Sequence, residues 1–160
     1  QTYGFVLGGA RMRVLEGSRY VASLETIAAT GGFDSALLGA PSDGPFLEAR
    51  ALLGAGRPLF GREVFANAEA AYRWRVDTQD RDEVVFDMTL GAHVGPRWMA
   101  LAQTFSTFEV DGDVHYTKAA ASVVYRHNEH LQLEFGGLAT VLGRNAIQEF
   151  GARAGVWWSF

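Results

Sequence analysis

The side chains of this 160-residue sequence that are suited to catalysis lie far apart. His93 and Asp87 would share one face of an extended segment, but six residues of strand separate them by roughly 20 Å. A general base and the group that orients it need hydrogen-bond contact, so this pair does not qualify. The chain has no cysteine, and no serine stands in the pattern of a nucleophile elbow. We therefore predict no catalytic residues and no enzyme.

Three side chains of the types that bind metals, His127, Glu129 and His130, stand together near a predicted turn. Imidazole and carboxylate groups bind zinc, but a metal site also needs a fixed geometry and a further ligand, and the sequence indicates neither. We predict a solvated polar turn there, with no metal and no cofactor. The formal net charge of -4 and the lack of a basic cluster exclude nucleic acid as a partner.

Charged residues instead recur at every second position of long segments. In Val64–Arg75 the even-numbered positions are apolar, while Asn67, Glu69 and Arg73 occupy odd positions. This period of two is that of a β-strand with one apolar and one polar face. The segment has about 12 residues, against about five or six in a typical soluble strand and roughly 9 to 11 in a tilted membrane strand. No run of about 18 apolar residues is present, which excludes a transmembrane helix.

Nine segments show this alternation, separated by stretches rich in turn residues. Gly31–Pro45 is the longest such stretch, and its apolar residues would pack among themselves or against the mouth of a barrel. Residues 54–61 form a Gly-Pro connector. Trp98–Phe108 fits either orientation, because polar residues interrupt both of its faces. The predicted strands are Tyr3–Leu15, Arg19–Thr30, Phe46–Leu53, Val64–Arg75, Val84–Val94, Trp98–Phe108, Thr117–Tyr125, Leu131–Val141 and Phe150–Phe160.

The two faces of these segments differ in a way that indicates a membrane. Ala, Val and Leu fill the apolar face in mid-strand, and aromatic residues gather near strand ends, as in the girdles of a transmembrane barrel. Charges of both signs occupy the other face, where they suit a lumen and not lipid. We therefore predict an all-β fold, a transmembrane antiparallel up-and-down β-barrel, as a single domain over residues 1–160. The girdle residues are Tyr20, Tyr72, Trp74, Phe86, Tyr125, Trp158 and Phe160. The predicted lumen-lining residues are Glu48, Arg50, Asn67, Glu69, Arg73, Glu83, Asp87, His93, Lys118, Arg126, Gln132, Glu134, Glu149 and Arg153.

These faces also constrain how neighbouring strands pair. For Thr117–Tyr125 and Leu131–Val141 to present their apolar faces together, the numbers of paired residues must sum to an even value. With a three-residue turn between the strands, this rule places Arg126 opposite His130.

The C-terminal segment has a spacing that resembles the assembly signal of bacterial outer-membrane β-barrels. Phe160 is the last residue, Trp158 precedes it by two positions, Gly155 by five and Arg153 by seven. The resemblance implies that the barrel-assembly machinery reads these four residues. It also implies a place in the bacterial outer membrane, among its lipids and lipopolysaccharide. The alternative is a buried closing strand of a soluble domain.

Three stretches resemble one family within that class. Phe65–Arg75, Leu101–Phe108 and Gly143–Ala146 look like the C-terminal part of the bacterial phenol-degradation (MetA-pathway) outer-membrane protein family. Members look like barrels of about twelve strands, which would place three strands before Gln1. This fits the even strand number of single-chain bacterial barrels. The segment at Gln1 lacks the pattern of a leader, so we expect any signal peptide outside it.

The family resemblance implies a channel or uptake pore for small molecules, including aromatic ones. The alternative function is a structural or anchoring outer-membrane barrel in a larger envelope assembly, with envelope proteins as partners. A count of eight strands, with Phe46–Leu53 outside the membrane, would need an irregular connection of about 30 residues, well beyond usual lengths.

Overall fold

The computed structural model describes residues 6–30, 45–76 and 81–159, and this part of the chain folds into one sheet of nine strands. The all-β prediction is confirmed. Within the described residues there is no helix that is long and apolar enough to cross a membrane. The strands are β1 (Val6–Glu16), β2 (Tyr20–Thr30), β3 (Phe46–Leu59), β4 (Arg62–Arg75), β5 (Glu83–His93), β6 (Trp98–Glu109), β7 (His115–Arg126), β8 (Leu131–Arg144) and β9 (Phe150–Trp158).

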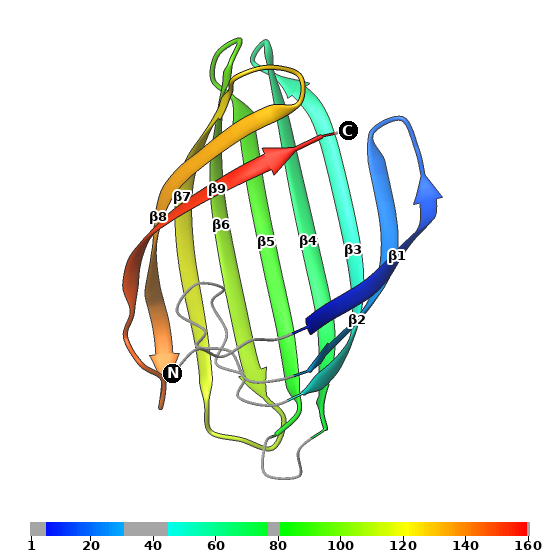
Figure 1. Ribbon diagram of the computed structural model, residues 1–160, viewed down its shortest axis with the longest axis vertical. Helices are drawn as coiled ribbons and strands as arrows, with labels where there is room; N and C mark the ends of the chain where they lie inside the picture. Colours follow the sequence, from blue (N-terminus) through cyan, green and yellow to red (C-terminus); the bar gives the residue numbers. More distant parts are fainter. Residues whose placement is uncertain (1–5, 31–44, 77–80, 160) are drawn as a thin grey trace.

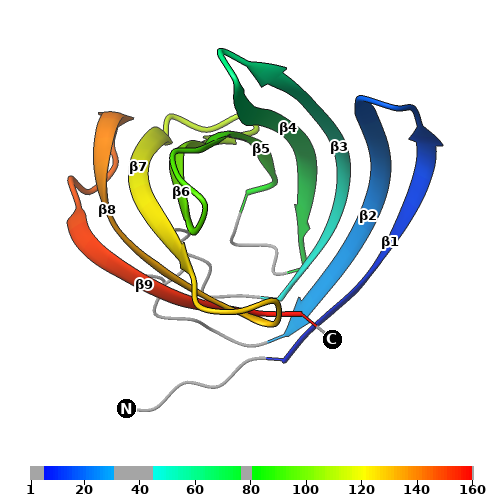
Figure 2. The same ribbon diagram turned by 90° about the horizontal axis from the view of Figure 1, so that it is seen from above.

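Each strand pairs antiparallel with the next one along the chain, so the sheet has up-and-down topology. Figure 2 shows that the sheet curls round on itself. It does not close, because β1 and β9 stand at the two ends of the strand order. Since nine strands alternate in direction, β1 and β9 run the same way.

The connections at the two ends of the sheet differ in length. Short hairpins join β1 to β2, β3 to β4, β5 to β6 and β7 to β8, at the top of Figure 1, where β9 also ends. We call this the hairpin end. Strands β2, β4, β6 and β8 end at the opposite end of the sheet, which we call the loop end, and the described residues of the connections there are 45, 76, 81–82, 110–114 and 145–149.

Strand β3 is longer than predicted, and the expected connector over residues 54–61 is wrong. β3 pairs with β4 down to Leu59 and Arg62, and only Phe60 and Gly61 form the turn. Both turn residues have positive φ, 51° and 73°, as a two-residue hairpin that matches strand twist requires. Pro58 is tolerated because β2 stops pairing with β3 at Ala55, so no donor toward β2 is needed there. Likewise, β8 continues to Arg144, through part of the predicted loop over residues 143–146.

The predicted pairing of Arg126 with His130 is wrong, although the even sum holds over most of β7 and β8. Arg126 pairs with Gln132, and the sum of 258 persists until a register shift between Thr117 and Lys118. The turn is longer than three residues because Asn128 closes it: its Oδ1 accepts hydrogen bonds from the backbone N–H groups of His130 and Leu131.

The pairing also settles the orientation of β6. Met99 lies opposite His93 and Gln103 opposite Thr89, so the odd-numbered residues of β6 share the polar face. Met99 and Leu101 are buried on that face, whereas Ala102 is exposed on the other. The sequence alone left this choice open because each face of Trp98–Phe108 mixes polar and apolar residues.

Some predictions fall outside the described residues. They are the loop over residues 31–44 with its Phe33, Leu37 and Leu38, the start of the first strand at Tyr3, residues 77–80 and the terminal Phe160.

Candidate functional site: the charged inner face

The sheet buries its charged face and exposes its apolar face. Glu48 and Lys118 have only 2% and 5% of their surface exposed, while Leu90 and Phe135 on the opposite face have 53% each. Figure 2 shows the curl of the sheet. The curl is the cause, because side chains on the concave side of a curved sheet have less room than those on the convex side. A soluble sheet packs its apolar face inside. We call the two sides the inner face and the outer face.

Strand pairing brings the predicted lumen residues together on the inner face. Cross-strand partners such as Glu48 and Arg73, Glu69 and Asp87, or Arg126 and Gln132 lie side by side along it. Glu149 lies just before β9 and accepts a 2.6 Å bond from the Lys118 ammonium. The inner-face set comprises Glu48, Arg50, Asn67, Glu69, Arg73, Glu83, Asp87, His93, Lys118, Arg126, Gln132, Glu134 and Arg153.

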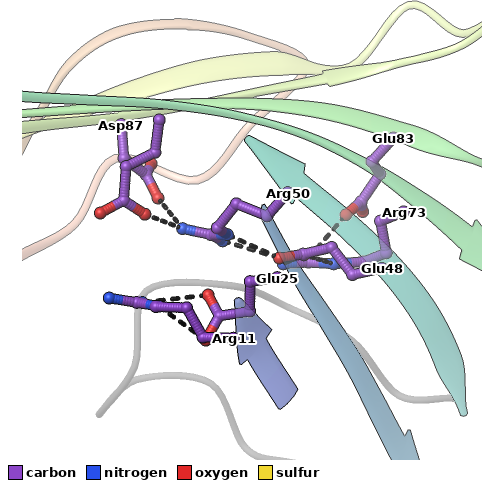
Figure 3. A network of polar contacts seen from close by, with 8 residues as sticks. Arg11, Glu25, Glu48, Arg50, Arg73, Glu83 and Asp87 are labelled. Atoms are coloured by element: carbon purple, nitrogen blue, oxygen red, sulfur yellow. Dashed lines mark hydrogen bonds and ion pairs between the residues drawn. The ribbon is translucent and has the colours of Figure 1, made fainter. Parts of the chain in front are cut away.

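Three arginines and four carboxylates from β3, β4 and β5 form one connected network, shown in part in Figure 3. Glu48 lies between two guanidinium groups, 2.8 Å from Arg50 and 2.7 Å from Arg73. Arg50 also reaches Glu69 and Asp87, at 2.5 and 3.0 Å. The arginine–carboxylate network is Glu48, Arg50, Glu69, Arg73, Arg75, Glu83 and Asp87.

Burial explains why these charges are paired. An isolated carboxylate removed from water costs several kcal/mol, and good pairing with further hydrogen bonds is needed to offset that cost. Glu48 meets this condition with both of its oxygens: Oε1 accepts from Arg50 Nε and Oε2 from Arg73 Nε. The guanidinium of Arg73 also lies over the Phe46 ring, 4.5 Å from its centroid. The network therefore makes a rigid wall whose charges largely compensate one another.

A second polar network crosses the inner face from β9 to β5. Glu134 accepts hydrogen bonds from Ser122 Oγ at 2.7 Å and Trp157 Nε1 at 3.0 Å, and forms an ion pair with Arg153 at 3.2 Å. Arg153 also donates to Gln103 Oε1, and Gln103 donates to Thr89. The Arg153 side chain thus links β9 to β6 without passing through the backbone of the strands between them.

Part of the inner face near the hairpin end is apolar. Met99, Leu101 and Val124 form a buried cluster, with Phe65 packed against it. The Phe65 ring covers Gly91, where a side-chain Cβ would overlap the ring. The inner face therefore carries an apolar cluster near the hairpin end, in addition to His93 and Arg126. The cluster is visible in the sequence, since Phe65 and Leu101 have the parity of the inner face, but we predicted only the polar residues of that face.

Trp157 is a further inner-face residue that the sequence analysis missed. The sequence analysis predicted only Trp158 of this pair, as a girdle residue. Trp158 lies on the exposed outer face, opposite Leu131. Trp157 has the parity of Arg153 and Gly155, and that parity was the available signal.

The fold does not bring His93 and Asp87 together, and it does not arrange the side chains of the His127–His130 turn around a common point. His93 contacts Arg126, with 3.5 Å between Nε2 and Nη2, whereas Asp87 contacts Arg50. His130 Nδ1 lies 3.0 Å from the carbonyl oxygen of Ser159. Over residues 6–30, 45–76 and 81–159, no three His, Asp or Glu side chains gather as metal ligands.

Aromatic side chains of the outer face gather at two levels. Trp98 packs on Tyr125 with 4.9 Å between ring centroids, near the hairpin end. Tyr72 packs on Trp74 at 4.9 Å, and Phe86 on Phe108 at 6.2 Å, near the loop end. Ala, Met, Val and Leu side chains lie between the two levels.

Comparisons of the chain with protein-family models, with curated proteins and with solved structures found no match.

Proposed function

We propose that the nine strands belong to a closed transmembrane β-barrel of the bacterial outer membrane, and that the inner face lines a passage for small molecules. The observation that carries this proposal is the inverted amphipathicity: charged side chains are buried on the inner face and large apolar side chains are exposed on the outer face. In water this arrangement would be unfavourable, because exposed apolar area is costly. In lipid it is the favourable one.

The height of the apolar band supports the same proposal. On β6, Trp98 and Phe108 mark the two aromatic levels, ten residues apart. At about 3.4 Å per residue this is roughly 34 Å along the strand. A tilt of about 40° reduces it to roughly 26 Å across the membrane, close to the ~25 Å apolar band of outer-membrane barrels.

The open edges of β1 and β9 require partners in lipid, because unpaired backbone groups cannot bond to water there. β1 and β9 run in the same direction, so antiparallel closure needs an odd number of further strands. Three such strands give the twelve-stranded barrel that the family resemblance implies. Short hairpins lie on the periplasmic side in this class, which puts the loop end outside the cell.

Conductance of the full-length protein in a planar bilayer tests the passage. We expect discrete channels, and we expect the double variant Glu69→Gln with Asp87→Asn to shift their ion preference toward anions. The physical reason is that both carboxylates neutralise Arg50, which would remain charged with fewer partners. The reversal potential in a salt gradient measures the shift, and Asp111→Asn, in an exposed turn at the loop end, is the control. A folded protein without conductance would contradict the passage.

A structural or anchoring barrel is the second candidate, and the paired state of the inner charges favours it. The carboxylates and guanidinium groups of the inner face pair with one another. Such pairing is expected in a barrel whose interior is filled by side chains as much as in one with a water-filled pore. Co-purification of envelope proteins with a non-conducting barrel would identify this function.

For the passage, the family resemblance implies that the transported molecules are small aromatic compounds.

Deleting Phe160 tests the proposed assembly signal. Loss of one interfacial ring removes about 2 kcal/mol of burial, so refolding from urea into detergent should be nearly normal. In cells we expect a much larger loss of assembled protein, since the barrel-assembly machinery would no longer recognise the terminus. Comparison of cellular levels with in-vitro stability checks this, and equal effects in the two assays would leave Phe160 as a girdle residue only.

A further inference from the structure

Five arginines near the hairpin end, of which Arg126 belongs to the inner face, lack the carboxylate partners that the arginines of the arginine–carboxylate network have. With three residues on either side of each, the hairpins 17–19, 60–61, 94–97 and 127–130 carry five arginines and three glutamates. With the same margins, the described residues around the loop-end connections carry four arginines against seven acidic residues. The sheet is therefore electrically polar along its strands. The five hairpin arginines are Arg19, Arg57, Arg62, Arg97 and Arg126.

These arginines stand on neighbouring hairpins, which hydrogen bonds link around the rim of this end. The backbone N–H of Gly56, next to Arg57, donates to the carbonyl of Arg19, and Arg62 donates to the carbonyl of His93. The backbone N–H of Arg126 donates to the carbonyl of Arg97. Within the described ranges, none of the five side chains forms an ion pair with a carboxylate, and all five are exposed.

Three of the rim arginines border the apolar band of the outer face. Arg57 pairs with Val64, and Arg62 has the same parity as Val64, so both lie on the outer face just beyond its apolar residues. The Arg97 guanidinium lies 3.4 Å from the hydroxyl of Tyr125, in the aromatic level of the hairpin end. Exposed guanidinium groups beside interfacial rings stand at the depth of lipid headgroups.

We infer that Arg57, Arg62 and Arg97 bind the phosphate groups of anionic phospholipids in the leaflet at the hairpin end. This inference rests on the proposed membrane barrel and goes beyond it by naming the lipid. Guanidinium groups donate in a fork that fits phosphate oxygens. At the loop end the described residues around the connections are more acidic than basic, which weakens the attraction for anionic headgroups there, so we expect the selectivity at the hairpin end.

Spin-labelled lipids test the inference in the reconstituted full-length protein. In phosphatidylcholine bilayers, a motionally restricted signal from labelled phosphatidylcholine reports membrane insertion by itself. The ratio of association constants for labelled phosphatidylglycerol and phosphatidylcholine reports selectivity. We expect a ratio of about five for headgroups in contact with an arginine, as one basic residue at an anionic surface implies.

The triple variant Arg57→Gln, Arg62→Gln, Arg97→Gln should lower this ratio to about one and leave the phosphatidylcholine signal unchanged. The matched control is Arg81→Gln with Arg144→Gln, two exposed arginines at the loop end, which should keep the wild-type ratio. High salt should reduce the wild-type ratio as well, because exposed charges are screened.

Three outcomes would overturn the inference. An unchanged ratio in the triple variant assigns the selectivity to other groups. Equal competition by soluble glycerol phosphate shows a site for free phosphate and not for lipid. Binding of soluble polyglutamate through the same arginines, with no lipid selectivity, indicates an acidic protein partner. Absence of any restricted lipid signal contradicts the membrane barrel itself, and is thus distinguishable from failure at the rim.

Discussion

Arginine in place of Ala68 should destabilise the folded protein in a bilayer by about 2 to 4 kcal/mol, and in place of Leu133 by about 1 kcal/mol at most. Leu133 pairs with Tyr125 in the aromatic level near the hairpin end, whereas Ala68 lies on the outer face in mid-strand, opposite Leu53 and Met88. A guanidinium there would face lipid at a depth where neither water nor a carboxylate can reach it. In a soluble protein the same substitutions would place a charge in water at almost no cost.

Asn67 and Gln132 provide matched controls, since each directly precedes one of these residues and has inner-face parity. Arginine at either control position should change stability by less than about 1 kcal/mol, the range usual for an accessible polar site. Urea unfolding from vesicles of the full-length protein measures the four free energies. Equal tolerance at all four positions would remove the membrane assignment.

Neutralising Glu48 should have the second large effect. Glu48→Gln keeps the shape of the side chain but leaves Arg50 and Arg73 without the carboxylate between them, and breaking a buried ion pair costs about 3 to 5 kcal/mol. Glu69, Asp87 and Glu83 still contact these arginines, so we expect the lower end of that range. The same unfolding experiment measures it.

An exposed pair on the same sheet supplies the control. Arg13 and Glu16 lie 2.8 Å apart, but their side chains are 60% and 64% exposed. Glu16→Gln should therefore change stability by about 0.5 kcal/mol at most, as surface ion pairs do. If Glu48→Gln costs no more than Glu16→Gln, the arginine–carboxylate network is solvated, and the inner face behaves as a wet surface.

The strands and their two faces could be predicted because both are local properties. The period of two in residues such as Glu69, Ala70, Ala71 and Tyr72 assigns each side chain to a face, whatever its neighbours are. Strand ends could not be predicted equally well. Gly54, Gly56 and Pro58 indicate a turn by type, yet pairing with β4 keeps them in a strand.

Long-range geometry accounts for what the sequence left open. The orientation of β6 depends on its pairing with β5, because both faces of β6 are mixed. The partner of Arg126 depends on how Asn128 closes its turn. The alternation of apolar and polar residues predicts neither the pairing of β6 with β5 nor the turn at Asn128. Both depend on contacts that this alternation does not record.

The sequence by itself determined that the protein is a long-stranded antiparallel sheet with charges on one face and apolar groups on the other, since alternation is written into each strand separately. Only the tertiary structure decided which of these charges meet. Curling brings Arg50 of β3 to Asp87 of β5 and Arg153 of β9 to Gln103 of β6, across strands that lie between them. Such contacts depend on the curvature of the whole sheet, which no single strand encodes.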